Sequence, residues 1–183
     1  MIRKLVHISG IVLTTVLVFA STGSAQSFDV SGGYAYRNES GGEGQPRLGI
    51  EKGWYGAGGF NLNDAFGVFG QVSQHAQSFF NDTVDVKLTI LGGGPRFTGN
   101  QRAGVTYFVN ALFGVATIKR TPATVDFPKK FAFQPAVGVD VKAGSTVGVR
   151  FEFAPTYIKP DEGVRAKDAW AYHFMVGVVV RGG

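Results

Sequence analysis

The sequence contains no cysteine. This absence excludes disulfide bonds, Cys-ligated zinc or iron–sulfur sites, a thiol nucleophile and lipid acylation of a cysteine. Charged residues are also few, at 17% of 183 residues, against about 25% in ordinary soluble domains. Hydrophobic residues reach 44%, so the protein has much apolar surface that needs to be kept away from water.

Long hydrophobic runs are almost absent. Residues 11–19 are nearly all apolar, which is shorter than the roughly 20 residues that a membrane-spanning helix needs. Arg3 and Lys4 precede this run and Gly23-Ser24-Ala25 follows it, the small residues that a signal peptidase reads. We therefore expect residues 1–25 to be an export signal cleaved after Ala25, rather than a membrane anchor, and residues 26–183 to form one domain.

A concentrated basic surface is also missing. The net charge is +5, but the basic residues are scattered and form no stripe, so we expect no nucleic-acid partner. The 27 glycines follow no Gly-X-Y period, and aromatic residues reach 13%. This composition indicates short strands joined by glycine-rich turns rather than collagen or disorder.

Alternation of apolar and polar residues is the main pattern that is present. Residues 147–157 are the clearest case, because Val149, Phe151 and Phe153 alternate with Arg150, Glu152 and Ala154. Successive side chains of a strand point to opposite faces, so such a segment has one apolar face. Similar segments cover residues 28–37, 84–91, 105–116, 131–142 and 170–181, with weaker alternation at 54–62 and 66–74. The sequence predicts an all-β, eight-stranded, antiparallel up-and-down transmembrane barrel.

Connections of unequal length set the expected orientation. Short turns are predicted near residues 63–64, 98–104 and 143–146, and longer polar loops at 38–52, 76–83, 119–130 and 159–169. Barrels of the outer membrane have short periplasmic turns and long external loops. We expect an aromatic girdle at the membrane interfaces, formed by Tyr34, Tyr36, Trp54, Tyr107, Tyr157, Trp170 and Tyr172. Prolines 95, 135 and 155 are expected near strand ends or at bulges.

The face opposite the apolar one mixes opposite charges with small residues. A soluble lipocalin-like barrel would place its apolar face inside, but most charges of this chain fall in predicted loops, which favours the membrane. An interior of eight strands is about filled by side chains, so salt bridges that close the barrel are favoured over an open lumen. The predicted lumen residues are Asp29, Arg37, Asp85, Lys87, Asn110, Gln134, Asp140, Lys142, Arg150 and Glu152.

Few residues indicate chemistry. Ser73, His75, His173 and Glu152 are candidates for acyl transfer or hydrolysis, but no nucleophile, base and orienting group can be assigned from their spacing. Three histidines spread through the chain predict no metal cluster, and no cofactor motif is complete. We expect no enzymatic activity and no cofactor.

Several short segments carry a resemblance to a known family. Gly94-Pro95-Arg96-Phe97, Ala111-Leu112-Phe113-Gly114 and the strand that ends the chain resemble the small bacterial outer-membrane β-barrel proteins, the porin-family or OmpA/OmpX-like barrels. The resemblance implies a monomer in the outer membrane of a Gram-negative envelope, with the lipid bilayer and a possible loop ligand as partners. Such barrels usually end on an aromatic residue, whereas this chain ends Val180-Arg181-Gly182-Gly183.

The expected function is structural or surface-interacting, through the long external loops. A narrow porin-like passive channel is the first alternative, a lipid-modifying outer-membrane enzyme the second and a soluble carrier the third. Each alternative assigns a different role to the interior of the barrel, which the sequence alone leaves open.

Overall fold

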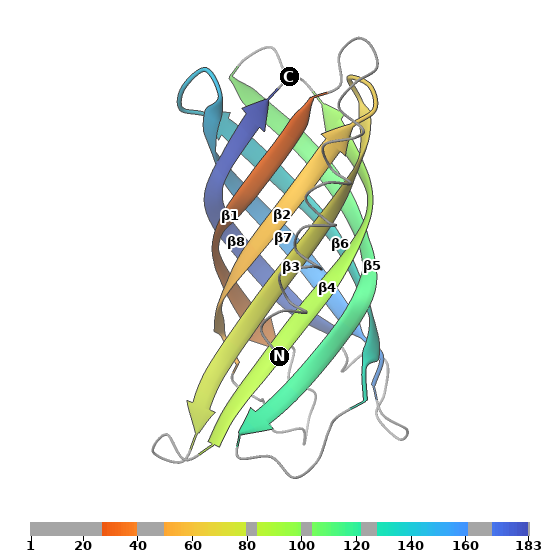
Figure 1. The fold of residues 1–183 in the computed structure, drawn as a ribbon, viewed down its shortest axis with the longest axis vertical. Coiled ribbons are helices and arrows are strands. Elements are labelled where there is room, and N and C mark those ends of the chain that lie inside the picture. Colours follow the sequence, from red (N-terminus) through yellow and green to blue (C-terminus); the bar gives the residue numbers. More distant parts are fainter. Residues whose placement is uncertain are drawn as a thin grey trace, which may run out of the picture.

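The computed structural model describes residues 27–39, 50–79, 84–99, 104–121, 128–160 and 170–182. These residues form eight strands (Figure 1): β1 (Phe28–Glu39), β2 (Lys52–Asn61), β3 (Phe66–Phe79), β4 (Val84–Gly99), β5 (Val105–Thr121), β6 (Lys130–Lys142), β7 (Val147–Ile158) and β8 (Trp170–Gly182). Among these residues no helix is long and apolar enough to cross a bilayer. The predicted export signal and its cleavage site lie outside the described residues.

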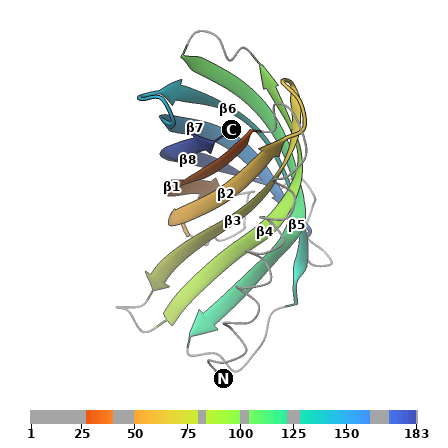
Figure 2. The same cartoon turned by 45° about the horizontal axis from the view of Figure 1, so that its top comes forward.

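Every strand pairs antiparallel with its neighbour in sequence, and β1 pairs with β8 to close the barrel. The closure is visible when the molecule is tilted (Figure 2). When the register is followed from a residue of β1 through all eight strand pairs and back to β1, it returns about ten residues from where it began. This stagger corresponds to a strand tilt of roughly 40° relative to the barrel axis. The predicted all-β, eight-stranded, up-and-down barrel is confirmed.

The two ends of the barrel differ. At one end, here called the turn end, tight turns at residues 62–65 and 143–146 join neighbouring strands, and β8 finishes there. Asn63 stabilises the first of these turns, because its side-chain oxygen accepts hydrogen bonds from the amides of Ala65 and Phe66 at 2.9 and 2.8 Å. The opposite end, here called the loop end, is where residues 40–49, 80–83, 122–127 and 161–169 connect the strands.

Strands β3, β4 and β5 extend further toward the loop end than the alternation predicted. Loops were expected to begin at residues 76 and 119, but pairing continues to Phe79 opposite Val84 and to Thr121 opposite Asp85. In Figure 1 these three strands project at the lower end of the barrel. The backbone ladder needs only hydrogen bonds, so it continues where apolar alternation no longer marks it.

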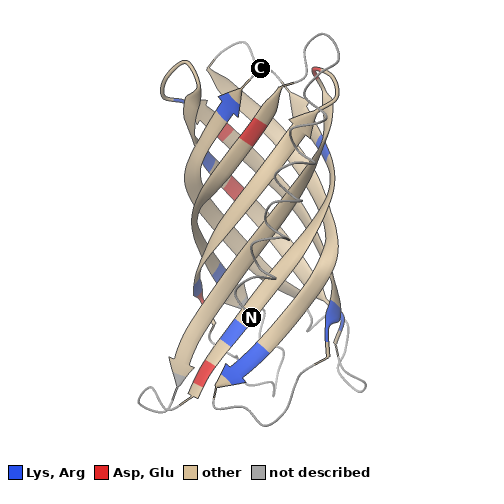
Figure 3. Ribbon diagram, in the orientation of Figure 1, with Lys and Arg blue, Asp and Glu red and all other residues tan. Residues whose placement is uncertain are grey.

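Large apolar side chains cover the outer face of the wall. Phe28, Val30, Val109 and Phe174 are about half exposed, and their strand neighbours point inward. All seven residues of the predicted aromatic girdle face outward: Tyr34, Trp54, Tyr107 and Tyr172 are exposed, and Tyr36, Tyr157 and Trp170 are half-buried. Figure 3 shows the middle of the wall almost free of charged residues. An apolar outer band with aromatic residues fits a barrel surrounded by lipid.

The prolines lie inside strands, so the expectation of strand ends or bulges was wrong. The register of β6 and β7 is the same at Phe133 opposite Tyr157 and at Val137 opposite Phe153, which places Pro135 opposite Pro155. No paired residues occur between those two rungs. Neither proline has an N–H, so this rung lacks hydrogen bonds in both directions while the strands keep their register.

Candidate functional site

The turn-end half of the interior holds a buried group of charged residues, here called the ionic cluster: Asp29, Arg96, Asp140, Arg150 and Arg181. They come from β1, β4, β6, β7 and β8, and all except Arg181 are almost fully buried. Each is among the four residues of its strand that lie nearest the turn end. The barrel therefore brings together charges that are up to about 150 residues apart in sequence.

Arg150 is the centre of this cluster. Its Nε and Nη2 atoms each donate to one oxygen of Asp140 at 2.7 Å, which is the side-on, two-bond arrangement of a guanidinium with a carboxylate. Nη2 also donates to Asp29 at 3.0 Å, and Nη1 donates to the hydroxyl of Ser31 at 3.0 Å. Arg181 reaches the second oxygen of Asp140 at 2.7 Å from the rim. One arginine of β7 thus links β6 on one side of it with β1, which lies beyond β8 on the other side.

Arg96 and Phe108 complete the cluster. Arg96 donates to Asp29 at 2.6 Å and to the side-chain oxygen of Asn110 at 3.0 Å. The ring of Phe108 lies 4.6 Å from the Arg150 guanidinium and 5.4 Å from that of Arg96, within range of cation–π attraction. This ring therefore joins the two arginines, whose like charges would otherwise repel each other.

Two glycines make room for these side chains. A Cβ atom at Gly138 would collide with the Phe108 ring, and one at Gly59 would collide with the guanidinium of Arg96 and the carboxylate of Asp29. Both residues point toward the interior. Their lack of a side chain is what lets the larger groups reach the axis of the barrel.

Together with Glu152, the ionic cluster is balanced in charge, and it leaves little space. Glu152 lies within electrostatic reach of Arg150 and Arg96, so three arginines face three carboxylates. The cavity among these residues has a volume of about 30 Å³, which is room for about one water molecule. The interior is therefore closed by side chains at this level.

A layer of small residues follows toward the loop end. It consists of Ala35, Ala57, Ala136 and Ala154, with Tyr55 and Met175 filling the centre. The amide of Gln71 approaches the Met175 sulfur at 3.7 Å. Alanines on the wall leave space that the two larger side chains occupy, so this layer is packed as well.

Two histidines meet in the loop-end half. The rings of His75 from β3 and His173 from β8 lie 4.8 Å apart, and both side chains are fully buried. Ser73 lies two residues before His75 on the same inward face. Among the described residues, no hydrogen-bond partner exists for either ring nitrogen of His173 or for the Ser73 hydroxyl. Glu152, the fourth candidate for chemistry, belongs instead to the level of the ionic cluster.

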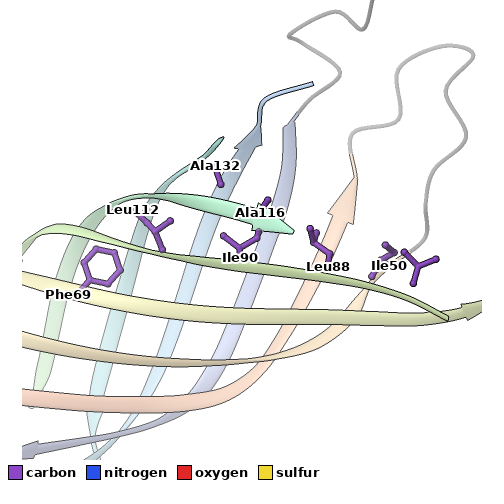
Figure 4. Packing of buried hydrophobic residues seen from close by; sticks show 8 residues of the cluster. Ile50, Phe69, Leu88, Ile90, Leu112, Ala116 and Ala132 are labelled. Atoms are coloured by element: carbon purple, nitrogen blue, oxygen red, sulfur yellow. The ribbon is translucent and has the colours of Figure 1, made fainter. Parts of the chain in front are cut away.

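An apolar cluster fills the interior near the loop end. Figure 4 shows Leu88 and Ile90 of β4 beside Leu112 and Ala116 of β5, with Ile50 further along. These side chains are at most 2% exposed. The loop-end interior is thus packed like the core of a soluble protein.

The prediction that Asp85 and Lys87 line the lumen was wrong. Their neighbours Val86 and Leu88 point inward and are buried, whereas Lys87 is exposed and Asp85 half-buried on the outer face. Apolar residues were assumed to face lipid along the whole strand, but the loop-end part of β4 has the opposite arrangement.

The other predicted lumen residues divide into two groups. Lys142 is exposed at the turn-end rim, outside the packed interior. The remaining seven are buried on the inner side of the wall: Asp29, Arg37, Asn110, Gln134, Asp140, Arg150 and Glu152. Arg96 and Phe108 were missed. The available signal for Arg96 was its even spacing from Val86, Leu88 and Ile90, because residues of the same parity face the same side throughout β4.

The described residues contain no group of three His, Asp, Glu or Cys side chains that could hold a metal ion. Among the described residues, His75 and His173 form the one pair of histidines, and the charged side chain that lies near both of them is the cation Arg37. The interior of the described barrel therefore offers charge-paired and apolar packing rather than a metal-ligand set.

Comparisons of sequence and of structure give different results. No protein-family model matches the chain, and no curated protein sequence matches it. Among solved structures, Ail of Yersinia pestis in complex with the heparin analogue sucrose octasulfate is 17% identical, covering 86% of this chain and 99% of Ail, with a TM-score of 0.59. Neisserial surface protein A is 16% identical, with 87% and 99% coverage and a TM-score of 0.63. OprG of Pseudomonas aeruginosa is 11% identical, with 86% and 96% coverage and a TM-score of 0.56. The chain has the fold of small outer-membrane barrels.

Proposed function

We propose that the chain is a monomeric barrel of a bacterial outer membrane, without enzymatic activity, that acts through contacts made at its loop end. The apolar outer wall and the likeness to outer-membrane barrels support this location. By the usual arrangement of such barrels, the turn end faces the periplasm and the loop end faces outward. The wall then serves as a rigid support for the external surface.

The ionic cluster is the observation that carries this proposal. A passive channel needs a continuous wet path, whereas Arg150 and its partners leave about 30 Å³ among them. Solutes would have to displace a guanidinium that is held by both Asp29 and Asp140. Breaking such a buried pair costs about 3–5 kcal/mol. This cost argues against a permanently open pore and in favour of a surface role.

Conductance in planar bilayers tests the proposal. The mature protein is inserted after its fold is verified by a heat-dependent shift on a denaturing gel, and we expect no steady ion current. A matched variant, Arg150→Ser with Asp140→Ser, removes the central pair together and is also expected to stay silent, because the layer around Tyr55 and Met175 and the apolar loop-end cluster remain packed. Discrete openings of the unchanged protein would overturn the surface role and establish the narrow channel.

A lipid-modifying activity is a second candidate, and one observation favours it. His75 and His173 meet at 4.8 Å with Ser73 on the same face, and His173 has both ring nitrogens unpartnered among the described residues. A serine hydroxyl that a histidine activates is a common nucleophile in acyl transfer and hydrolysis. Mass spectra of phospholipid vesicles before and after incubation would decide it. New lipid species that vanish with His173→Ala would establish the enzyme, and unchanged spectra would exclude it.

A further inference from the structure

Exposed lysines are placed around the loop end of the wall on five different strands or their immediate ends. We call this set the lysine girdle: Lys52, Lys87, Lys119, Lys129 and Lys159. All five side chains are exposed, and none forms an ion pair among the described residues. The blue segments at the lower ends of β4 and β5 in Figure 3 belong to this region.

Strand alternation fixes the direction of these side chains. Lys52 precedes outward-facing Trp54 by two residues, and Lys159 follows outward-facing Tyr157 by two residues. The amide of Lys159 donates to the carbonyl of Phe131 at 2.9 Å, which continues the register of β6 and β7. These lysines therefore point away from the barrel axis, parallel to the plane of the surrounding membrane.

Lys87 and Lys119 are directly opposite each other on β4 and β5, and both face outward. Like charges at directly opposed positions of a sheet destabilise it. The carboxylate next to them on the outer face, Asp85, already accepts a hydrogen bond from the Ser78 hydroxyl at 2.7 Å. An anion bound between the two ammonium groups would relieve their repulsion.

The girdle begins where the apolar outer band ends. Leu91 of β4 and Val115 of β5 are exposed apolar residues. On the outward face of each strand, one threonine separates this residue from Lys87 or Lys119, which lies further toward the loop end. Four residues span about 13 Å along a strand, or about 10 Å along the axis of a barrel whose strands tilt by roughly 40°. The lysines therefore lie just beyond the loop-end edge of the apolar band, where the headgroups of a surrounding bilayer are expected.

Among the described residues, the outward strand positions near the turn end carry no lysine or arginine. Apolar side chains occupy most of them, among them Phe28, Phe97, Val105, Val141, Val147 and Val180. Arg181 and Lys142 alternate with outward residues and so belong to the inner side or the rim. The asymmetry between the two ends is what a barrel requires if only one leaflet presents anionic groups to it.

We propose that the lysine girdle binds phosphate groups of lipids in the outer leaflet. A surface hollow of about 520 Å³ at the tips of β3 and β4, lined by Gln77, Ser78, Asp85 and Lys87, offers hydrogen-bond donors beside the charged pair. Lysines that point sideways at headgroup level meet membrane phosphates before they meet a soluble polyanion. This binding is separate from the surface role proposed above, since a silent or a conducting barrel could equally have it.

Association of a phosphorylated lipid with the folded protein tests the inference. The mature protein is placed in phosphatidylcholine bilayers with a minor fraction of fluorescent lipid A, and energy transfer from the two tryptophans reports the relative association constant. One lysine near an anionic surface is worth about fivefold in binding. The variant Lys52→Gln, Lys87→Gln, Lys119→Gln is therefore expected to lose about a hundredfold.

Controls separate charge at the loop end from charge in general. Lys142→Gln removes the same charge at the turn end and is expected to leave lipid association unchanged, and the heat-dependent gel shift verifies the fold of each variant. Equal association of the unchanged protein with lipid A and phosphatidylcholine would overturn the inference. Displacement of lipid A by soluble dextran sulfate at equal charge would overturn it too, because the girdle would then bind a soluble polyanion.

Discussion

Replacing Arg150 by methionine should be among the most damaging single changes to this barrel. The side chain is 1% exposed and donates to Asp29, Asp140 and Ser31. Methionine fills a similar length but leaves the carboxylates with fewer partners. Asp140 would retain only Arg181, whose side chain is 37% exposed, and Asp29 would retain only Arg96.

The magnitude follows from leaving a buried carboxylate partly unpaired. Removing one partner of a buried ion pair costs about 3–5 kcal/mol. With a urea m value of about 2 kcal/mol/M, the unfolding midpoint should fall by roughly 2 M. The double variant Arg150→Met with Asp140→Leu removes one positive and one negative charge together. It leaves Arg96 and Arg181 against Asp29 and Glu152, so the double variant should be more stable than the single one.

Urea titration of the barrel folded into lipid vesicles measures these values, with the fraction folded read from the heat-dependent gel shift. Lys142→Met, at the exposed rim, is the matched control and should change the midpoint little. The reasoning is refuted if Arg150→Met stays within about 1 kcal/mol of the unchanged protein, or if the double variant loses as much as two independent substitutions would.

Three further changes test the packing, the ladder and the face assignment. Gly138→Ala should lower the free energy of unfolding by about 1–3 kcal/mol, because the added methyl group meets the aromatic ring packed above it. Pro135→Val with Pro155→Val should raise it by about 1–3 kcal/mol through two restored hydrogen bonds, and slow amide exchange of β6 and β7 would report this. In the cysteine-free chain, Lys87→Cys should react with a water-soluble maleimide on whole cells, whereas Leu88→Cys should not.

The number and order of the strands could be predicted because membrane barrels repeat one local rule. Each segment such as residues 147–157 reports its own apolar face, and sequential hairpins need no long-range information. The sequence also predicted that the interior contains charged side chains, since Asp140 and Arg150 alternate with apolar neighbours. Strand ends were less accessible, because pairing beyond Ala76 and Thr117 depends on backbone hydrogen bonds that leave no apolar period.

The contacts inside the barrel depend on register, which alternation does not contain. Arg150 meets Asp29 across the closing seam of the barrel, and His75 meets His173 from strands that are not neighbours. A shift of two residues in any hairpin would keep every apolar face intact and separate these partners. The glycine at position 138 reads in the sequence as a small strand residue, and only the Phe108 ring above it explains why it has no side chain.

The error at Asp85 and Lys87 has a physical cause that concerns the whole molecule. Toward the turn end, lipid surrounds the wall and charged groups such as Arg96 turn inward to be paired. Toward the loop end, the projecting strands leave the hydrocarbon layer for the polar headgroups and the water beyond them, so Leu88 turns inward and Lys87 outward, as in a soluble barrel. The change occurs within one strand without a bulge, because only the surroundings change and the register does not. A barrel longer than the membrane is thick must reverse its pattern in this way, and the lysines just beyond the reversal are positioned to meet the headgroups that border it.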